Sequence, residues 1–411
     1  MEMPINKDLA LLMHVDLNSC FATIEQQANP LIRNQPVVVA TCDTPGGMVI
    51  ASSYEAKALG IKLGTRVKEA KTIYRGTHIL TPDPDKYFDA QHRFYEILSN
   101  YSDKVWPKSV DEFLIDFRGS TLIREGLSME KIGFRIKQDV KEFLGEYVTI
   151  NVGIGTNPFL AKLAAGLHKP DGLDRIDHKN ILAIYKTINL LDFPGINLRY
   201  EARLNLAKIY TPIDFLNSTV PKLKDEVFKS IIGYYWYLRL RGYPIDNIDF
   251  KRKSFGHQYA LLRKTRDLNE LNKLLMKLSE KTGRRLRSKG YYAKGLKLFL
   301  KFEDGSYFNK SLSLNYPIFA TADIYRAINK IFRSLQLQSN VREISISVFN
   351  LYPKNFRQLD LFLQPGQDPN NLAEVSDSIN NRYGEFTLIP ALMANMRDLI
   401  IRRVAFGEHR D

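Results

Sequence analysis

Two adjacent carboxylates, Asp111 and Glu112, stand in the middle of the stretch SVDEFLIDF at residues 109–117. Successive side chains of a β-strand point to opposite faces of the sheet, so two adjacent acids inside a strand would turn one charge toward the buried face. A hairpin turn at the acids removes this conflict, because both carboxylates can then face solvent or a cation while the apolar residues that follow form the next strand. Taken alone, the pair is best explained as a plain acidic turn.

A third acid, Asp16, follows the apolar stretch LALLMHV, which is typical of a strand that ends at this residue. If this strand lies beside the hairpin, the carboxylates of Asp16, Asp111 and Glu112 repel one another unless cations neutralise them. Mg²⁺ suits such a site, because it prefers a few carboxylate oxygens together with phosphate and water. Two such ions would stabilise both the attacking and the leaving oxygen of a phosphoryl transfer. This chemistry fits an enzyme that acts on nucleic acid.

Basic residues are concentrated in one segment of the chain. The sequence has 59 lysines and arginines against 45 acidic residues, a net charge of +14, and residues 251–301 alone hold 16 of the basic residues and three acids. Within them, EKTGRRLRSKGYYAKGLK interleaves cations with Tyr291 and Tyr292, as expected for a surface along a phosphate backbone. A solvated helix face or an anionic membrane surface are the alternatives. So concentrated an excess favours nucleic acid.

The composition sets further limits on the class of protein. A chain of 411 residues with 44% hydrophobic content can bury real cores, and we expect roughly two to four domains. The two cysteines, Cys20 and Cys42, are too few for a disulfide framework or a cysteine-based metal site. No apolar run is long enough to span a bilayer. We therefore expect a soluble cytoplasmic protein, a monomer, with no membrane partner.

Apolar spacing predicts the elements that must position the acids. Strands are predicted at 9–15, 35–40, 48–52 and 147–155, helices at 20–29, 54–60, 85–101 and 129–144, and a hairpin at 104–117. Asn157 followed by Pro158 is typical of a helix start. The preceding GIGT has two glycines of a dinucleotide fingerprint, but Pro158 replaces the third, and we expect no parallel βαβ unit here. The order of elements favours an α+β arrangement with helices on an antiparallel sheet.

The second half of the chain has three segments with different predicted secondary structure. Residues 180–243 are predicted to be all-helical, with FPGIN at 193–197 as a tight turn between two helices. Residues 254–352 show the order β, α, β, β, α, β, with Asp304 and Gly305 at the tip of a hairpin. The tail from about Pro353 is rich in Pro, Asn and Gln, and we expect it to be only partly ordered.

Five blocks match a known family in order, namely MHVDLNSCFATIEQQANP, MVIASSYEAKALGIKLG, SVDEFLIDF, TINVGIGTNPFLAKLAAGLHKPDGL and LLDFPGIN. Over nearly its whole length the chain resembles the Y-family translesion DNA polymerases, of the DNA polymerase IV or DNA polymerase V branch. The resemblance implies an α+β multidomain fold, the right-hand polymerase. It assigns residues 1–19 and 84–174 to the palm, 20–83 to the fingers, 175–245 to a helical, helix-hairpin-helix-like thumb, 254–352 to a βαββαβ little finger and 353–411 to a tail.

The resemblance also implies roles for the acids and their neighbours. Asp16 and Asp111 would ligate two Mg²⁺ ions, Glu112 would complete the site, and the carbonyl oxygen of Leu17 would add a ligand. Phe21, five residues after Asp16, matches the steric gate, an aromatic residue that excludes the ribose 2′-hydroxyl. The spacing alone would instead favour Phe21 as a core residue of an amphipathic helix.

Three further residues match positions at which the family binds the incoming deoxynucleoside triphosphate, namely Tyr54, Lys57 and Lys169. A phenol and two cations can hold phosphate oxygens by charge-assisted hydrogen bonds. Lys57 departs from the arginine common in the DNA polymerase IV branch and lacks its bidentate fork. Asn197 stands in FPGIN where the family usually has glycine, and we expect a phosphate-binding turn there, because asparagine tolerates left-handed backbone.

The pentapeptide QLDLF, formed by Gln358, Leu359, Asp360, Leu361 and Phe362, lies in the tail. It resembles the motif by which bacterial polymerases bind the sliding clamp, and such an apolar cluster in a polar tail has no obvious core of its own to enter. The alternative is that these side chains pack back onto the little finger.

The resemblance therefore implies a template-directed DNA polymerase that works on primer-template DNA and performs low-fidelity translesion synthesis by two-metal nucleotidyl transfer. Two other functions stay open. A nucleotide cyclase also uses paired acids on a palm, although the glycine pair of its GGDEF motif is absent. A catalytically inactive relative that only binds DNA and the clamp is the second alternative, against which the presence of all three acids counts.

Overall fold

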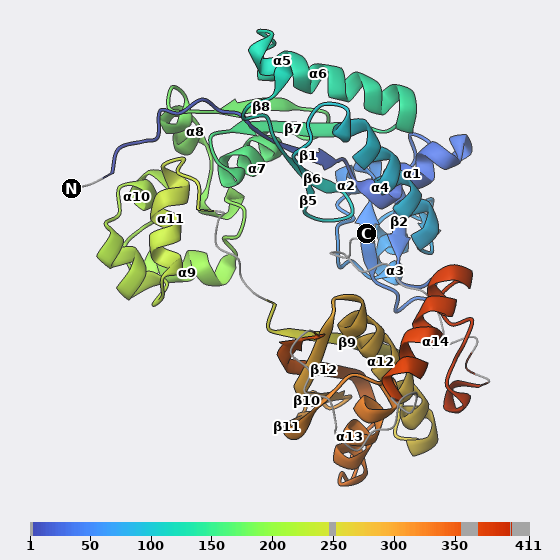
Figure 1. Ribbon diagram of the computed structural model, residues 1–411. Helices are drawn as coiled ribbons and strands as arrows, with labels where there is room; N and C mark the ends of the chain where they lie inside the picture. The colour runs from blue at the N-terminus through green and yellow to red at the C-terminus, as the bar shows by residue number, and fades with distance from the viewer. Residues whose placement is uncertain (1–2, 246–251, 355–368, 395, 397–411) are drawn as a thin grey trace. The chain divides into compact units, whose positions relative to one another are not determined.

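The computed structural model describes residues 3–245, 252–354, 369–394 and 396 (Figure 1). These residues form two compact units, the first within 3–245 and the second within 252–396. Each unit has its own hydrophobic core, and each is described by itself. Residues 358–362, with the predicted clamp motif, lie outside the described residues.

Within residues 3–245, a five-stranded sheet in the order β5-β6-β1-β7-β8 forms the centre of the first unit (Figure 1). Its strands are β1 (Leu12–Leu17), β5 (Val105–Pro107), β6 (Glu112–Asp116), β7 (Ile150–Gly155) and β8 (Leu173–Ile176). β1 lies between β6 and β7 and pairs with both in antiparallel register. β5 and β6 also pair antiparallel, which confirms the predicted hairpin.

The helices of the first unit are α1 (Cys20–Ala28), α2 (Tyr54–Ala58), α3 (Val67–Ile73), α4 (Pro84–Ser99), α5 (Thr121–Arg124), α6 (Met129–Asp139), α7 (Pro158–Leu167), α8 (Ile181–Thr187), α9 (Leu198–Leu206), α10 (Pro212–Leu216) and α11 (Ile232–Leu240). The two faces of the central sheet are covered by different helices. Met13 and Val15 of β1 are buried in the core to which α1, α4 and α6 contribute. Leu12 clusters instead with Ala161 of α7. Because side chains alternate along a strand, Asp16 shares the α7 face with Leu12.

One expectation about the central sheet is wrong. The segment β7-α7-β8 is a βαβ unit, because β7 and β8 pair in parallel. The glycines of GIGTNP serve close packing in this unit: a Cβ on Gly153 would lie 2.1 Å from the carbonyl oxygen of Ala161. Asn157 caps α7 as predicted, since its side-chain oxygen accepts a hydrogen bond from the amide of Leu160.

Residues 37–80 contain a small sheet in the order β3-β2-β4. Its strands are β2 (Val37–Ala40), β3 (Val49–Ser52) and β4 (His78–Leu80). Ser53 ends the connection after β3 and caps α2 by accepting a hydrogen bond from the amide of Ala56. This cap fixes the start of the helix that carries Tyr54 and Lys57.

Residues 181–240 are helical as predicted, and α8 to α11 pack around buried aromatic residues that include Phe193, Phe215 and Trp236. FPGIN forms a turn in which Gly195 has a φ of +97°. The expectation of a left-handed Asn197 is wrong. Its φ is −115°, and its side-chain oxygen caps α9 by accepting from the amides of Arg199 and Tyr200.

Within residues 252–354, a four-stranded antiparallel sheet in the order β11-β10-β12-β9 carries helices α12 and α13 (Figure 1). The elements are β9 (Ser254–Thr265), α12 (Leu268–Ser288), β10 (Tyr291–Phe302), β11 (Tyr307–Ile318), α13 (Thr321–Arg333) and β12 (Val341–Pro353). This order is the predicted one. Gly305 has a φ of +88° at the tip of the β10–β11 hairpin, as expected from the Asp-Gly pair.

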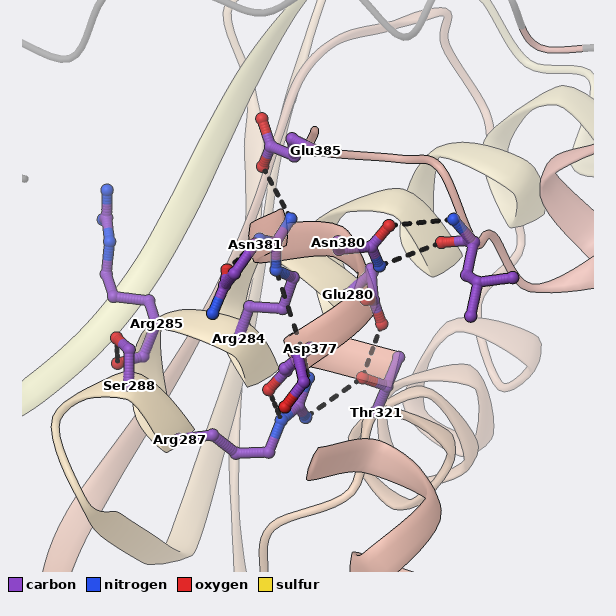
Figure 2. A network of polar contacts seen from close by, with 12 residues as sticks. Glu280, Arg284, Arg285, Arg287, Ser288, Thr321, Asp377, Asn380, Asn381 and Glu385 are labelled. Carbon is purple, nitrogen blue, oxygen red and sulfur yellow. Dashed lines mark hydrogen bonds and ion pairs between the residues drawn. The ribbon is translucent and has the colours of Figure 1, made fainter. Parts of the chain in front are cut away.

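Residues 369–394 of the tail are among the described residues and include a helix. Residues Pro369–Tyr383 form helix α14, which packs beside α12, and Met393 and Met396 are buried in the core of the second unit. Figure 2 shows the polar contacts that join the two helices, in which Arg287 and Arg284 of α12 meet Asp377 of α14. Helix α14 and the described residues 384–394 and 396 therefore belong to the second unit. Among the residues that the structure describes, no helix is long and apolar enough to cross a membrane.

Candidate functional site

Asp16 and Glu112 are direct partners in the antiparallel pair of β1 and β6. Directly opposed residues point to the same face of a sheet, so both carboxylates lie on the face that α7 covers. His14, two residues before Asp16, shares this face. One ligand atom from each of these three residues lies within 4.8 Å of the other two. The structure thus brings together two of the three acids that the sequence singled out.

Asp111 lies one residue before β6, in the connection that follows β5. Its carbonyl oxygen accepts a hydrogen bond from the amide of Leu17 at 2.9 Å, which holds this connection against the end of β1. Its carboxylate accepts a hydrogen bond from the hydroxyl of Ser109. Asp111 is therefore adjacent to the close group of His14, Asp16 and Glu112 without being part of it.

Two lysines contact the acids. Lys162 of α7 donates from Nζ to both carboxylate oxygens of Glu112, at 2.7 and 2.6 Å. Lys169, in the loop after α7, donates to Oδ2 of Asp16 at 2.7 Å. Sequence reasoning found Lys169 and missed Lys162. One feature of the sequence could have indicated Lys162. It lies on a helix that starts at a strong cap, and this helix must cover a face of the sheet.

The environment shifts the pKa values of the two acids in opposite directions. Burial raises the pKa of Asp16 above its ordinary value, although Lys169 opposes this effect. Burial alone would also raise the pKa of Glu112, but the hydrogen bond from Lys162 and nearby positive charges outweigh it, and the pKa lies below its ordinary value. Glu112 is therefore held as a carboxylate at neutral pH.

His14 is buried, with a side-chain exposure of 3%, and its Nε2 lies 4.0 Å from Oε1 of Glu112. That nitrogen has no hydrogen-bond partner among the described residues. Burial lowers the pKa of His14 to about 4, so the imidazole is neutral at neutral pH. His14 therefore packs inside the first unit and also faces the acids.

The predicted nucleotide residues lie beside the connection from β1 to α1. The hydroxyl of Tyr54 contacts Oδ1 of Asn18 at 3.4 Å, and Lys57 donates to the hydroxyl of Ser19 at 2.7 Å. The ammonium of Lys57 also lies over the Tyr54 ring, 4.5 Å from its centroid. Burial raises the pKa of Tyr54 to about 12 and lowers that of Lys57.

Phe21 of α1 is buried and stacks on Tyr87 of α4, with ring centroids 4.3 Å apart. This packing agrees with the core role that spacing alone favoured. The role of Phe21 as a steric gate stays a prediction.

A cavity of about 430 Å³ opens at the acids. Asp16, Glu112, Asp192, Lys162 and Lys169 line it, together with uncharged residues that include Leu163, Ile188 and Pro194. Carboxylates suit divalent cations, and lysines suit phosphate oxygens. A cavity with both kinds of group can hold a phosphorylated substrate together with the cations that neutralise it.

Comparisons with known proteins identify the family of this chain. The impB/mucB/samB family matches residues 15–166, and the C-terminal domain of that family matches residues 252–361. A DNA polymerase IV of Pelotomaculum thermopropionicum is 30% identical over 404 residues, which cover 97% of this chain and 99% of the relative. A DNA polymerase IV of Moorella thermoacetica is 31% identical over 388 residues, which cover 93% and 95%.

Solved structures show the same fold. A Y-family DNA polymerase chimera of Dbh and Dpo4 is 25% identical with a TM-score of 0.71, and the match covers 83% of this chain and 99% of the chimera. An insertion ternary complex of Dbh DNA polymerase is 24% identical with a TM-score of 0.56 and the same coverage. Together with the relatives, these matches decide against a nucleotide cyclase. The chain belongs to the impB/mucB/samB family and is a DNA-directed DNA polymerase of the Y-family.

Proposed function

We propose that this polymerase joins deoxynucleotides by two-metal nucleotidyl transfer at Asp16, Asp111 and Glu112. The observation that carries the proposal is the register of β1 and β6, which places Asp16 opposite Glu112 on one face of the sheet. Asp111 adjoins them through its hydrogen bond with the amide of Leu17. We assign the carbonyl oxygen of Leu17 to the same ligand set, since it lies at the end of the strand that carries Asp16.

The residues present fit Mg²⁺ by two criteria. The ligands are hard oxygen atoms, which Mg²⁺ prefers, and the acids already have positively charged partners in Lys162 and Lys169. Two bound Mg²⁺ ions supply charge stabilisation to the attacking and the leaving oxygen of the transfer. The protein's own contribution is to hold Asp16 and Glu112 on a strand pair and Asp111 in the connection that adjoins it.

Residues around the cavity suit the triphosphate of the incoming nucleotide. Lys169 lines the cavity, and Lys57 and Tyr54 lie beside the connection that follows Asp16. Their phenol and ammonium groups would bind phosphate oxygens. Phe21, two residues after Ser19, would lie against the sugar and exclude the 2′-hydroxyl of a ribonucleotide.

The second unit is the proposed surface for primer-template DNA. On β10, Leu296, Leu298 and Leu300 are buried against the helices. Lys297 and Lys301 alternate with them and therefore point to the opposite face of the sheet. Their charge agrees with the basic excess of residues 251–301 and with binding to a phosphate backbone. We keep the proposed division into palm, fingers, thumb and little finger with the boundaries given above.

We infer that the enzyme copies past damaged bases. The proposed fingers have strands of three or four residues and helices α1, α2 and α3 of nine, five and seven residues. So small a region offers little surface to test the shape of a base pair, which favours tolerance of damage at the expense of fidelity. We also infer that Leu361 and Phe362 bind the sliding clamp in a bacterial cytoplasm, because the relatives named above are bacterial enzymes.

Primer extension with Mg²⁺ tests the proposed function. The wild-type protein should extend a primer opposite an undamaged base and opposite an abasic site, whereas Asp111→Ala should lose incorporation on both templates and still bind DNA. Extension by Asp111→Ala at the wild-type rate would contradict the assignment of the acids. Extension that always stops at the abasic site would contradict translesion synthesis alone.

A further inference from the structure

Lys162 occupies both oxygens of a carboxylate that the proposed function assigns to metal ions. Its Nζ lies 2.7 and 2.6 Å from the two oxygens of Glu112, and Lys169 contacts Asp16 in the same way. The resemblance to the family implied no role for Lys162. The following inference rests on the proposed function, because it concerns how these lysines act on the metal site.

An ammonium group and a divalent cation cannot share the same carboxylate oxygens at low cost. Like charges a few ångströms apart repel even when water screens them, and the repulsion is larger at a partly buried site. A metal ion that approaches Glu112 must therefore displace Lys162. The metal affinity of the site is reduced by the free energy of that Lys–Glu contact.

The structure gives Lys162 room to leave. Its side chain is 42% exposed, and it lines the same 430 Å³ cavity as Lys169. A lysine side chain has many rotamers, so its ammonium can move within this cavity without a change in the backbone. A triphosphate in the cavity would offer it negative charge as a replacement for Glu112.

His14 offers Glu112 a second partner after the lysine has moved. Its Nε2 lies 4.0 Å from Oε1 of Glu112, is buried, and has no hydrogen-bond partner among the described residues. The carboxylate therefore keeps a neighbour on its protein side in both states.

We propose that Lys162 is a positioning residue that acts as the internal counter-ion of Glu112 and keeps the metal site weak until a nucleotide triphosphate draws the lysine away. Metal binding and nucleotide binding then become coupled, since each makes the other more favourable. Without a nucleotide, the acids stay neutralised by the chain itself. This arrangement limits the binding of metal ions to a polymerase that has no substrate.

Mn²⁺ binding to the full-length protein tests the proposal without a measurement of activity. Free Mn²⁺ is counted by electron paramagnetic resonance, first without nucleotide and DNA and then with a non-hydrolysable deoxynucleoside triphosphate. Lys162→Met should bind Mn²⁺ about tenfold more tightly than wild type in the absence of nucleotide, because one positive charge beside the ion is removed. With the nucleotide bound, the Mn²⁺ affinities of Lys162→Met and wild type should differ by less than about threefold. The variant has then lost the coupling between nucleotide binding and metal binding.

Three further variants define the result. Lys162→Gln removes the charge but keeps a polar side chain, so it should bind Mn²⁺ more tightly as well, and it replaces Lys162→Met if that variant does not fold. Lys162→Arg keeps the charge and should resemble wild type. Lys264→Met is the control in the second unit, where Lys264 forms an exposed ion pair with Glu303 at 2.6 Å. It should leave Mn²⁺ binding unchanged.

Equal Mn²⁺ affinities of wild type, Lys162→Met and Lys162→Gln would overturn the proposal. Glu112→Gln separates this failure from a failure of the proposed function. If Glu112→Gln weakens Mn²⁺ binding while the Lys162 variants do not change it, the metal site stands and only the counter-ion role is wrong. If Glu112→Gln has no effect on Mn²⁺ binding, the assignment of Glu112 to the metal site is wrong, and the counter-ion role falls with it.

Discussion

Arg287 of α12 donates two hydrogen bonds to the carboxylate of Asp377 on α14, from Nε at 2.5 Å and from Nη2 at 2.8 Å (Figure 2). Its Nη1 donates to the carbonyl oxygen of Phe319 and to the hydroxyl of Thr321. The Arg287 side chain is only 3% exposed. A buried charge is tolerated when it is paired and hydrogen-bonded, so Asp377 is what allows Arg287 to lie inside the second unit.

Asp377→Ala should therefore destabilise the second unit by about 3 kcal/mol, because it leaves the guanidinium of Arg287 buried without its carboxylate. Hydrogen exchange read by mass spectrometry should show faster exchange in α12 and α14. Asp323→Ala removes the partner of Arg326, which is largely exposed, and should change exchange by a small amount only. If the two substitutions change hydrogen exchange equally, the buried pair of Arg287 and Asp377 does not stabilise the second unit more than an exposed pair does.

Local sequence signals predicted the elements well where the cause of each element is itself local. Apolar periodicity gave the order of strands and helices in the second unit, and Asn157 with Pro158 marked the start of α7. The docking of α14 was missed, because it depends on Asp377 meeting Arg287, 90 residues earlier in the chain. A composition rich in Pro, Asn and Gln says nothing about such a partner.

In the candidate site, too, the sequence predicted the features that have a local cause and missed those that depend on distant parts of the chain. The pairing of Asp16 with Glu112 follows from two strands that the sequence marks clearly. The contact of Lys162 with Glu112 depends on how α7 crosses the sheet, which no local pattern encodes. The parallel pairing of β7 with β8 was missed for a similar reason, since a missing third glycine argues against a nucleotide fingerprint but not against a βαβ unit.

Phe21→Ala should raise the ratio of ribonucleotide to deoxynucleotide incorporation at least about tenfold, since it removes the ring proposed to exclude the 2′-hydroxyl. It should also cost about 3 kcal/mol of stability, because the ring stacks on Tyr87 in the core. The ratio is measured as relative kcat/KM for the two nucleotides in primer extension.

Phe94→Ala is the matched control for the loss of stability. Phe94 is fully buried in the same core but belongs to α4 and has no proposed contact with the nucleotide. It should lower stability to a similar extent and leave the sugar ratio unchanged. If both variants change the ratio equally, Phe21 acts through packing and the gate assignment fails.

His257 should make the second unit less stable in mild acid. Burial, together with Arg285 and Lys281, lowers the pKa of His257 from 6.5 to about 3. Between these two values the unfolded chain binds a proton and the folded unit does not, so stability is fully present above pH 6.5 and is lost as the pH falls. From pH 7 to pH 5 the loss should be about 1 to 2 kcal/mol.

Hydrogen exchange of β9 and β12 as a function of pH, corrected for the intrinsic exchange rate, measures this loss in the second unit alone. His257→Gln cannot be protonated and should give a flatter profile between pH 7 and pH 5 than the wild type. Identical slopes for the two proteins would show that His257 does not control the response to acid.

The clamp prediction rests on the sequence, since Gln358–Phe362 lies outside the described residues. The described residues on either side belong to the second unit, where Lys354 forms an ion pair with Glu374 of α14. The motif therefore lies between two elements of one unit. A polymerase bound to the clamp through it would stay near the primer end at a high effective concentration.

Leu361→Ala with Phe362→Ala should remove clamp binding and clamp-stimulated synthesis but leave the unstimulated extension rate unchanged, because neither residue belongs to the proposed active site. Titration of a purified bacterial clamp against the polymerase measures the affinity. Leu372→Ala with Val375→Ala is the matched control, since it removes two exposed apolar side chains of α14 outside the motif and should leave clamp binding intact. Equal clamp affinity of the motif variant and the wild type would rule out docking through this motif. Loss of binding in the control alone would instead place the docking surface on α14, whose exposed apolar residues would then take the role proposed for Leu361 and Phe362.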